Sequence, residues 1–346
     1  MLLACLLVCF SAQAGTSDVA QKRVLVLHGL RIDAQTTIVA ERAFQKILRE
    51  GLEGHLDYYS EYIDLVRFSD PGYQSALIDF LRHKYAGRRF DLIITVNGLT
   101  LDFVERHSAA LFPGAPVVFL GHGSSAIEDL RSRLNCVGFV ESVNLKGTLD
   151  LALKLQPGVR QVVVVNGVSN DDQRIESVFR QQSRDLEGRL IFTYLSSLPL
   201  KEIQYRVANL PNDSMIYYLS LSRDVEGNRF LAHEAVQKVA SVANVPVYIG
   251  FSGYLNSQVI GGNVLDIESL ADRTAELALR VLRGENPNDI PIIEWKPNVN
   301  ILNWRQLKRW GISEDRLPPG SIVQFKELTL WEEHKWLILG VIYIFT

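Results

Sequence analysis

Apolar and polar residues alternate in two different rhythms along this chain from residue 22 onward. Short runs rich in Val, Ile and Leu predict strands, and the amphipathic stretches of helical period between them predict helices. Runs such as VVVV and LIIT are apolar on both faces, which is typical of parallel sheets covered by helices on each side. The strand candidates are residues 23–29, 56–66, 91–97, 115–121, 136–142, 161–167, 189–195, 214–220 and 246–250, and the helix candidates are residues 34–50, 73–86, 144–155, 171–184, 228–243 and 267–283.

The order of these elements predicts an α/β fold with two doubly wound parallel-sheet lobes, a hinge and a ligand cleft. The chain of 346 residues is also longer than one compact core usually fills. We expect residues 22–121 and 252–284 to form the first lobe and residues 136–250 to form the second. Residues 285–335 contain several prolines and no long period, and we expect them to be an extended connector.

Both ends of the chain are apolar. Residues 1–14, MLLACLLVCFSAQA, end in a small-x-small pattern and predict a signal peptide, although no basic residue precedes the apolar run. A short buried helix is the alternative for this segment. The run WLILGVIYIFT, residues 336–346, lacks a polar face and is about half as long as a bilayer core is thick. We interpret it as the start of a truncated transmembrane helix.

Composition and motifs argue against several classes of site. The formal net charge is −3 and there is no basic block, so a nucleic-acid partner is not expected. Removal of the predicted signal peptide would leave only Cys136, which gives no internal disulfide and no metal-ligand spacing. Stretches that begin at Gly123 and Gly250 resemble a hydrolase nucleophile elbow but lack its final glycine. We therefore expect no catalytic residues, no metal and no cofactor.

Polar and aromatic residues at the carboxyl ends of the predicted strands are the candidate ligand contacts, because ligands bind at those ends in open α/β sheets. At the start of a helix such residues act as N-caps, and the free N–H groups beside them can bind an anionic group. An aromatic ring beside hydroxyl groups also suits a pocket for a small molecule. Packing between the lobes is the alternative role for Tyr254. The candidates with this placement are Asn97, Gly98, Thr100, Ser220, Ser252 and Tyr254.

Several stretches carry a family resemblance that covers residues 22–285. They are DLIITVNGLTLDF, APVVFLGHGSS, NCVGFVESVNLKGTLDLALKLQPGVRQVVVV and VIGGNVLDIESLADRTAELALRVLRGENP. Their order resembles the ABC transporter substrate-binding family, which has the type I periplasmic binding protein fold and no catalytic residues. The family often has Thr or Ser with small residues at its first ligand loop, where this chain has Asn-Gly-Leu-Thr. The ligand loops implied by the resemblance contain Asn97, Gly98, Thr100, Gly121, His122, Ser124, Ser169 and Asn170.

The C-terminal region carries a second resemblance. NILNWRQLKRWGISEDRLPPGSIVQFKELTLWEEHKWLILGVIYI is similar to the junction between an outer domain and a transmembrane helix in bacterial sensor histidine kinases. The histidine kinase boxes themselves do not occur in this sequence. The resemblance implies a periplasmic sensor domain that is tethered to the inner membrane and signals when it closes on a small molecule, with a homodimer as one arrangement.

The hypotheses for function therefore differ in the step that comes after ligand binding. The first is the membrane-tethered sensor, and the alternative is a periplasmic protein that delivers a small solute to an ABC permease. The family implies an amino acid or an aromatic compound as the ligand. An enzyme of the hydrolase type, acting through Ser252 or Ser124, is a third hypothesis.

Overall fold

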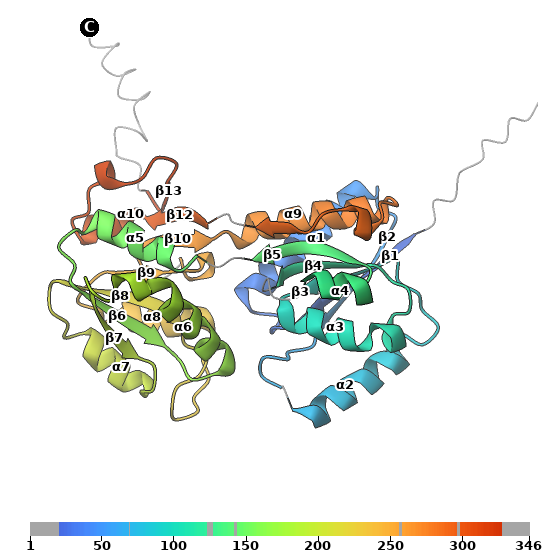
Figure 1. Cartoon of the computed structure of the whole chain (residues 1–346), viewed down its shortest axis with the longest axis horizontal. Helices are drawn as coiled ribbons and strands as arrows, with labels where there is room; N and C mark the ends of the chain where they lie inside the picture. The colour runs from blue at the N-terminus through green and yellow to red at the C-terminus, as the bar shows by residue number, and fades with distance from the viewer. Residues whose placement is uncertain are drawn as a thin grey trace, which may run out of the picture.

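The chain folds into two α/β lobes that lie side by side (Figure 1). In each lobe, helices cover both faces of one sheet, and the carboxyl ends of the parallel strands point toward the other lobe (Figure 1). We call these carboxyl ends the interlobe edge of the sheet. The computed structural model describes residues 21–68, 70–122, 127–141, 144–255, 258–295 and 298–326.

The first lobe is built on a parallel sheet that is buried on both faces. Its strands are β1 (Lys22–His28), β2 (Leu56–Tyr62), β3 (Leu92–Val96), β4 (Val117–His122), β5 (Cys136–Glu141) and β11 (Ile293–Trp295), in the order β11-β5-β4-β3-β1-β2. Its helices are α1 (Gln35–Gly51), α2 (Pro71–Lys84), α3 (Gly98–Leu111), α4 (Ile127–Arg133), α9 (Ile267–Leu282) and the 3₁₀ helix η3 (Pro287–Asp289).

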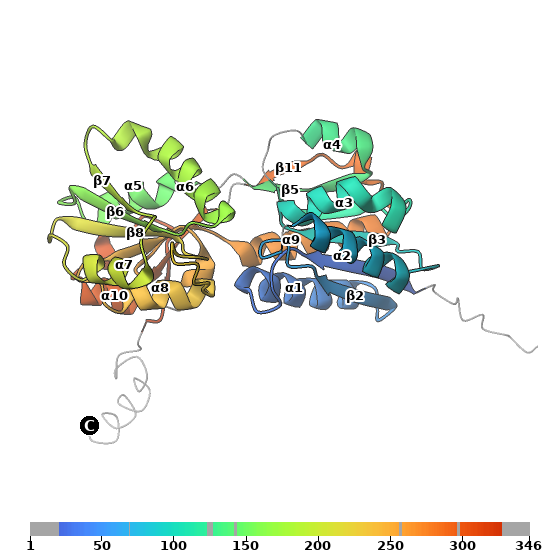
Figure 2. The same ribbon diagram turned by 90° about the horizontal axis from the view of Figure 1, so that it is seen from below.

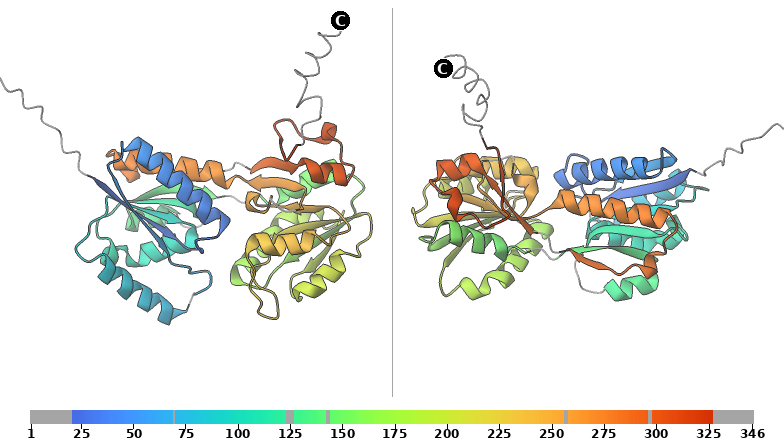
Figure 3. Two further views of the ribbon diagram at one scale, coloured as in Figure 1. Left: turned by 180° about the vertical axis from the view of Figure 1, so that it is seen from behind. Right: turned by 90° about the horizontal axis from the view of Figure 1, so that it is seen from above.

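The continuous apolar run of β1 is explained by the helices that cover both faces of the sheet. Val24 and Val26 pack under α1 and α9, whereas Leu25 and Leu27 pack under α2 and α3 on the opposite face. All four side chains are fully buried. The helices α1 (blue) and α9 (orange) lie side by side on their face of the sheet (Figure 3).

The second lobe contains a mixed sheet in the order β13-β12-β10-β9-β8-β6-β7, in which the β10–β12 pair is antiparallel. Its strands are β6 (Gln161–Asn166), β7 (Ile191–Leu195), β8 (Ser214–Ser220), β9 (Val247–Ile249), β10 (Gly261–Leu265), β12 (Asn298–Asn303) and β13 (Ile322–Gln324). Its helices are α5 (Lys146–Leu155), α6 (Asn170–Ser183), α7 (Leu200–Val207), α8 (Ala232–Ala240), α10 (Trp304–Arg309) and the 3₁₀ helices η1 (Arg184–Leu186), η2 (Ser252–Tyr254) and η4 (Glu314–Arg316). Residues of α5, α6 and α10 pack on one face, and residues of α7 and α8 pack on the other.

The predicted α/β fold with two lobes is confirmed, but two strands belong to the other lobe from the one predicted. Strand β5, placed in the second lobe by the sequence, pairs with β4 in the first sheet. Strand β10, placed in the first lobe, pairs with β9 and β12 in the second sheet. A strand that is apolar on both faces fits the interior of either sheet, so its pattern does not identify its neighbours.

The predicted extended connector is also wrong. Within residues 285–335, β11 pairs with β5 in the first sheet, and β12 and β13 complete the second sheet. Ile301 and Leu302 of β12 are buried in the second lobe. These strands are short and irregularly spaced, so neither a period of two nor a helical period was visible in the sequence.

The chain crosses between the lobes at three places among the described elements. The first crossing lies between Glu141 and Asn144, the second between Leu265 and Ile267, and the third between Trp295 and Asn298. Viewed from below, the second crossing, which leads from β10 into α9, runs between the two lobes (Figure 2). The two lobes are therefore joined at three places, and two lobes connected in this way can close about a hinge.

Both predicted terminal segments, residues 1–14 and residues 336–346, lie outside the described residues. In the part of the chain that the structure describes, none of the helices has the length and apolar character needed to cross a membrane.

Candidate functional site

The turn between β3 and α3 places Asn97 at the interlobe edge of the first sheet. Its backbone has φ 82° and ψ 164°, a conformation that is nearly restricted to glycine and costs other residues about 1–3 kcal/mol. The Asn97 side chain accepts a hydrogen bond from the Thr100 N–H at 3.2 Å. A Cβ atom on Gly29 would come within 2.6 Å of the Asn97 amide group, so the two loops are closely packed. The fold therefore maintains a strained turn at a predicted ligand loop.

The same turn offers backbone donors rather than the Thr100 hydroxyl. Thr100 is fully buried, and its hydroxyl donates to the carbonyl groups of Val96 at 2.9 Å and Asn97 at 2.8 Å. Helix geometry leaves the N–H groups of the first turn without intrahelical partners. Because Asn97 caps the Thr100 N–H, the N–H groups of Gly98 and Leu99 are those that can bind an anionic ligand group.

A partly buried carboxylate lies behind the interlobe edge of the first lobe. Glu41 of α1 is hydrogen-bonded to His28 Nε2 at 2.9 Å and accepts hydrogen bonds from the hydroxyls of Ser60 at 2.6 Å and Tyr58 at 3.0 Å. Burial alone would raise the pKa of Glu41, but the hydrogen bonds from His28 and Ser60 help to hold it below its ordinary value. His28 is fully buried and stacks on Tyr62 with 5.0 Å between ring centroids. This cluster ties β1, β2 and α1 together.

A cavity of about 340 Å³ opens beside the Tyr62 ring. Ion pairs join Arg31 to Asp33 and Arg67 to Asp64 in its wall, and the hydrogen bonds to Asp64 raise the pKa of Arg67. The wall is therefore polar but close to neutral in charge. Its lining residues are Arg31, Ile32, Asp33, Tyr62, Asp64 and Arg67.

The second lobe has its own buried carboxylate, Asp172, at the interlobe edge. It accepts hydrogen bonds from the Ser169 N–H at 3.0 Å, the Ser220 hydroxyl at 2.6 Å and the Ser222 N–H at 3.2 Å. The Ser169 hydroxyl accepts from the Asp172 N–H at 3.1 Å, which completes a capping box at the start of α6. The side chains of Ser169 and Ser220 are thus already engaged inside the protein.

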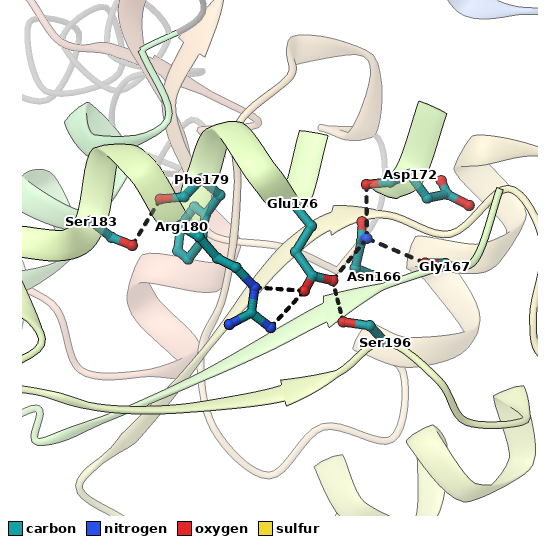
Figure 4. A network of polar contacts seen from close by, with 8 residues as sticks. All are labelled: Asn166, Gly167, Asp172, Glu176, Phe179, Arg180, Ser183 and Ser196. Carbon is teal, nitrogen blue, oxygen red and sulfur yellow. Dashed lines mark hydrogen bonds and ion pairs between the residues drawn. The ribbon is translucent and has the colours of Figure 1, made fainter. Parts of the chain in front are cut away.

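A polar network next to Asp172 connects α6 to the ends of β6 and β7 (Figure 4). One oxygen of Glu176 accepts two hydrogen bonds from Arg180, at 2.8 and 2.7 Å. The other oxygen accepts from Asn166 Nδ2 at 3.2 Å and from the Ser196 hydroxyl. Arg180 also lies over the Tyr194 ring, 3.3 Å from its centroid. The network borders a cavity of about 290 Å³ lined by Gly167, Val168, Gln173, Glu176, Ser177, Arg180, Ser196 and Ser197.

The 3₁₀ helix η2 brings aromatic side chains to the place where the lobes meet. The Tyr254 ring lies edge-on to Tyr218, with 5.2 Å between centroids, and to Phe251, with 6.1 Å. Burial raises the pKa of both tyrosines, so their hydroxyls stay protonated at neutral pH. A Cβ atom on Gly253 would meet Gln35 Cγ of α1 at 3.1 Å, and Phe251 packs against the cores of both lobes. The second lobe therefore touches the first through η2.

Comparison with known families identifies the kind of protein that has this geometry. Residues 39–317 match the family described as ABC transporter substrate binding protein, which is most of the chain. The chain belongs to this family. The membership expected from the sequence motifs is therefore confirmed.

Individual relatives of this substrate-binding protein are distant. A tyrosine-binding protein of Clostridioides difficile is 21% identical over 175 residues, which are 50% of this chain and 49% of the relative. The chain thus spans about half the length of this curated relative. Two solved structures each match 88% of this chain and 100% of their own: a conserved domain protein from Vibrio cholerae (TM-score 0.63, 14% identity) and an ABC domain in complex with L-Trp from Streptococcus pneumonia (TM-score 0.62, 15% identity). They confirm the type I periplasmic binding protein fold.

The structure places the described members of the predicted ligand set on the interlobe edges of both sheets. In the first lobe, Gly121 and His122 end β4, beside the Asn97 turn that ends β3. Ser124 lies outside the described residues. The members in the second lobe are the N-cap Ser169 and the first helical residue Asn170 of α6, Ser220 at the end of β8, and Ser252 and Tyr254 in η2.

The prediction omitted the charged residues that border both cavities. Arg31, Asp33, Asp64 and Arg67 lie in loops that follow β1 and β2, and no motif distinguishes them in the sequence. Asp172 could have been found, because Ser169 followed by an acidic residue three positions later is a capping-box pattern. Glu176 and Arg180 have the i,i+4 spacing of an ordinary surface pair, which concealed their position beside a cavity.

Proposed function

We propose that this protein binds a small amphiphilic solute of the aromatic amino acid class between the two interlobe edges and closes around it. The observation that carries this proposal is that a surface of backbone N–H groups on one lobe faces a surface of aromatic side chains on the other. The first lobe presents the uncapped N–H groups after Asn97, and the second presents the aromatic rings of Phe251 and Tyr254. The 3₁₀ helix η2 touches the first lobe at Gln35. A ligand that needs both surfaces favours the closed state, because the open state cannot supply both sets of contacts at once.

The chemistry of each surface matches one part of such a ligand. A carboxylate suits the N–H groups of Gly98 and Leu99 at the start of α3. An aromatic ring suits the Tyr254 and Phe251 rings, since edge-to-face contacts between aromatic rings contribute about 0.5–1.5 kcal/mol beyond burial. The near-neutral polar wall of the 340 Å³ cavity suits the polar groups of a zwitterion.

Relatives support the same ligand class. The curated relative is named a tyrosine-binding protein, and one structure with the same fold holds L-Trp. Identities of 21% and 15% leave the side chains of the ligand site free to differ. The proposal therefore names the class of ligand and leaves the choice between tyrosine, tryptophan and a related aromatic compound to measurement.

Calorimetric titration with L-tyrosine and L-tryptophan tests the ligand class. We expect saturable binding of at least one of them and weaker binding of glycine, which lacks the ring. Tyr254→Ala should weaken this binding about tenfold, as loss of roughly 1.4 kcal/mol of ring contacts would. Tyr205→Ala is the matched control, because Tyr205 lies on α7 with 69% of its surface exposed. Absence of heat and of any thermal shift with both aromatic amino acids would refute the proposed ligand class.

The use made of the bound solute is a separate part of the proposal. The family described as ABC transporter substrate binding protein favours delivery of the solute to an ABC permease. The sensor hypothesis depends on residues 336–346, which lie outside the described residues. Cell fractionation separates the two. Release of the intact chain by osmotic shock supports delivery, whereas retention in membranes after a carbonate wash supports the tethered sensor.

A further inference from the structure

Two carboxylates in the wall of the 340 Å³ cavity each have one oxygen that no donor reaches. Arg31 donates to Oδ2 of Asp33. Arg67 donates to Oδ2 of Asp64 from both Nε and Nη2. The other oxygens, Asp33 Oδ1 and Asp64 Oδ1, are buried and have no hydrogen-bond partner among the described residues. Asp64 as a whole is only 7% exposed. A buried carboxylate oxygen without a donor is unfavourable, so this wall has a shortage of hydrogen-bond donors.

Both carboxylates act on the same part of the cavity. The hydrogen bonds to Asp64, together with the charges of Asp64 and Asp33, raise the pKa of Arg67. Both carboxylates therefore lie close to one guanidinium group. That group is already engaged, because it pairs with Oδ2 of Asp64 and lies over the Phe68 ring, 5.4 Å from its centroid. The two Oδ1 atoms are thus acceptors that a group from outside the protein can use.

The wall favours a cation over an anion. Its two buried unpartnered atoms are both acceptors. The side chains of Arg31 and Arg67 are ion-paired and are 38% and 37% exposed, so water weakens the field of their charges. The Asp64 side chain is only 10% exposed and keeps more of its field. An ammonium group supplies a positive charge and three N–H donors, which is what the two oxygens lack.

The size and the remaining wall of the cavity favour an organic cation. A volume of about 340 Å³ is much larger than the roughly 30 Å³ of one water molecule and lies at the small end of ligand pockets. Tyr62 and Ile32 give the wall an apolar part for a carbon chain, and an aromatic ring also attracts an organic cation. A metal ion needs more oxygen ligands, and the described part of the chain has no group of three His, Cys, Asp or Glu that could hold one.

We propose that Asp33 and Asp64 form a subsite for the primary ammonium group of a small organic amine. The subsite lies at the interlobe edge of the first lobe, in the loops that follow β1 and β2. The ammonium group can belong to the aromatic amino acid or to a separate amine. In the first case the inference rests on the proposed function and names the residues that bind the amino group. In the second case it adds another ligand.

Titration of the full chain with butylammonium at constant ionic strength tests the subsite without the proposed ligand. We expect saturable binding of butylammonium. Butanol, which lacks the charge, and tetramethylammonium, which lacks N–H donors, should each bind at least about tenfold more weakly. Equal binding of tetramethylammonium would show that the carboxylate oxygens do not recognise the N–H groups. No saturable binding of butylammonium, or its displacement by acetate or calcium ions at lower concentration, would also overturn the proposal.

Two variants that keep the size of the side chain test the named residues. Asp64→Asn should weaken butylammonium binding about tenfold, and Asp33→Asn, at a side chain that is 40% exposed, about threefold. Asp79→Asn is the matched control, because Asp79 pairs with Arg82 at the same i,i+3 spacing as Asp64 with Arg67 but is 64% exposed on α2. If Asp64→Asn does not fold, Asp33→Asn decides the question. Equal affinities for Asp33→Asn, Asp79→Asn and the unmodified chain would overturn the proposal.

Titration with L-tyrosine and L-tryptophan, and with their deaminated analogues, identifies the source of the ammonium group. If the amino acid supplies it, Asp64→Asn weakens amino acid binding about tenfold but leaves the weaker binding of the deaminated analogue unchanged. If a separate amine supplies it, Asp64→Asn leaves amino acid binding unchanged, and butylammonium binds in the presence of the amino acid. If neither amino acid binds the unmodified chain, the proposed ligand class fails, and the butylammonium titration still decides the subsite.

Discussion

Glu41 in the first lobe and Asp172 in the second are carboxylates that accept several hydrogen bonds near the interlobe edge, but the two are stabilised in opposite ways. Glu41 in the first lobe is surrounded by side chains, with His28, Ser60 and Tyr58 as hydrogen-bond partners from two strands. Asp172 in the second lobe is held mainly by backbone N–H groups and a serine hydroxyl at the start of α6. The first arrangement can respond to protonation, and the second fixes the geometry of a turn. The two lobes therefore share a fold but differ in the contacts that stabilise their interlobe edges.

Asp172→Ala should have the largest effect on the second lobe. Loss of the buried carboxylate breaks the capping box and leaves the N–H groups of Ser169 and Ser222 without their acceptor, which should lower the free energy of unfolding by about 3 kcal/mol. Urea denaturation measures this change. Asp171→Ala is the control, since Asp171 is the preceding residue and forms an exposed pair with Arg174 whose loss should cost roughly 0.5 kcal/mol. Similar losses for both variants would show that the Asp172 carboxylate is not a structural centre.

In the first lobe, the contribution of Glu41 should appear in the pH dependence of the unfolding free energy. The folded-state pKa of Glu41 lies below its ordinary value of 4.5, so this group stabilises the fold above that pH, and the stabilisation is lost as pH falls through the folded-state pKa. Between pH 6 and the acid transition, Glu41→Gln should therefore show a flatter dependence of unfolding free energy on pH than the unmodified chain. Glu50→Gln on the exposed end of α1 is the control. If the unfolding free energy of the Glu41→Gln variant depended on pH as steeply as that of the unmodified chain, the assigned direction of the Glu41 pKa shift would be wrong.

Much of the fold could be predicted from the sequence because burial leaves a strong pattern. The run that became β1 is apolar on both faces in the sequence and fully buried on both faces in the structure. The same property explains why β5 was predicted in the wrong lobe, because the sequence of a strand that is buried on both faces does not indicate which sheet it joins. Which sheet such a strand joins depends on the strand that pairs with it. Gly138 of β5 shows why β5 fits beside β4, because a Cβ atom at this position would lie 2.2 Å from the Phe119 carbonyl oxygen.

The interlobe edge was predictable in position but not in chemistry. Strand ends and capping residues marked Asn97 and Ser169 as members of ligand loops, since local sequence specifies where a helix begins. The strain at Asn97, the internal use of the Ser220 hydroxyl and the pairing of Arg67 with Asp64 depend on contacts made by the folded chain. A single sequence contains no local signal for such contacts.

Asn97 allows a smaller perturbation of the first lobe that separates stability from binding. Asn97→Gly relieves a backbone conformation that glycine adopts freely and loses only a weak cap, so we expect a gain of about 1 kcal/mol in unfolding free energy. Asn97→Ala keeps the strain and loses the cap, and should instead cost about 1 kcal/mol. Thermal and urea unfolding measure both. If Asn97→Gly is the less stable of the two variants, the turn is not strained in the way that its dihedral angles indicate.

The smallest expected effect concerns the contact between the lobes at η2. In Gly253→Ala the new methyl group would lie 3.1 Å from Gln35 Cγ and 3.2 Å from Gln35 Cβ, which is tighter than ordinary packing. Either α1 or η2 must yield by a few tenths of an ångström, and we expect a change in unfolding free energy of less than about 1 kcal/mol. Gly158→Ala is the control, because no atom lies within 4 Å of its added methyl group.

The informative readout for Gly253→Ala is therefore the separation of the lobes rather than stability. Spin labels at Ala76→Cys on α2 and Lys201→Cys on α7 occupy exposed positions of different lobes. Because the methyl group acts between η2 and α1, it should shift the mean distance between these labels without widening the distribution. Gly158→Ala should leave both the mean and the width of the distribution unchanged. If Gly253→Ala and Gly158→Ala gave the same mean distance, the contact between Gly253 and Gln35 would not control the position of the lobes.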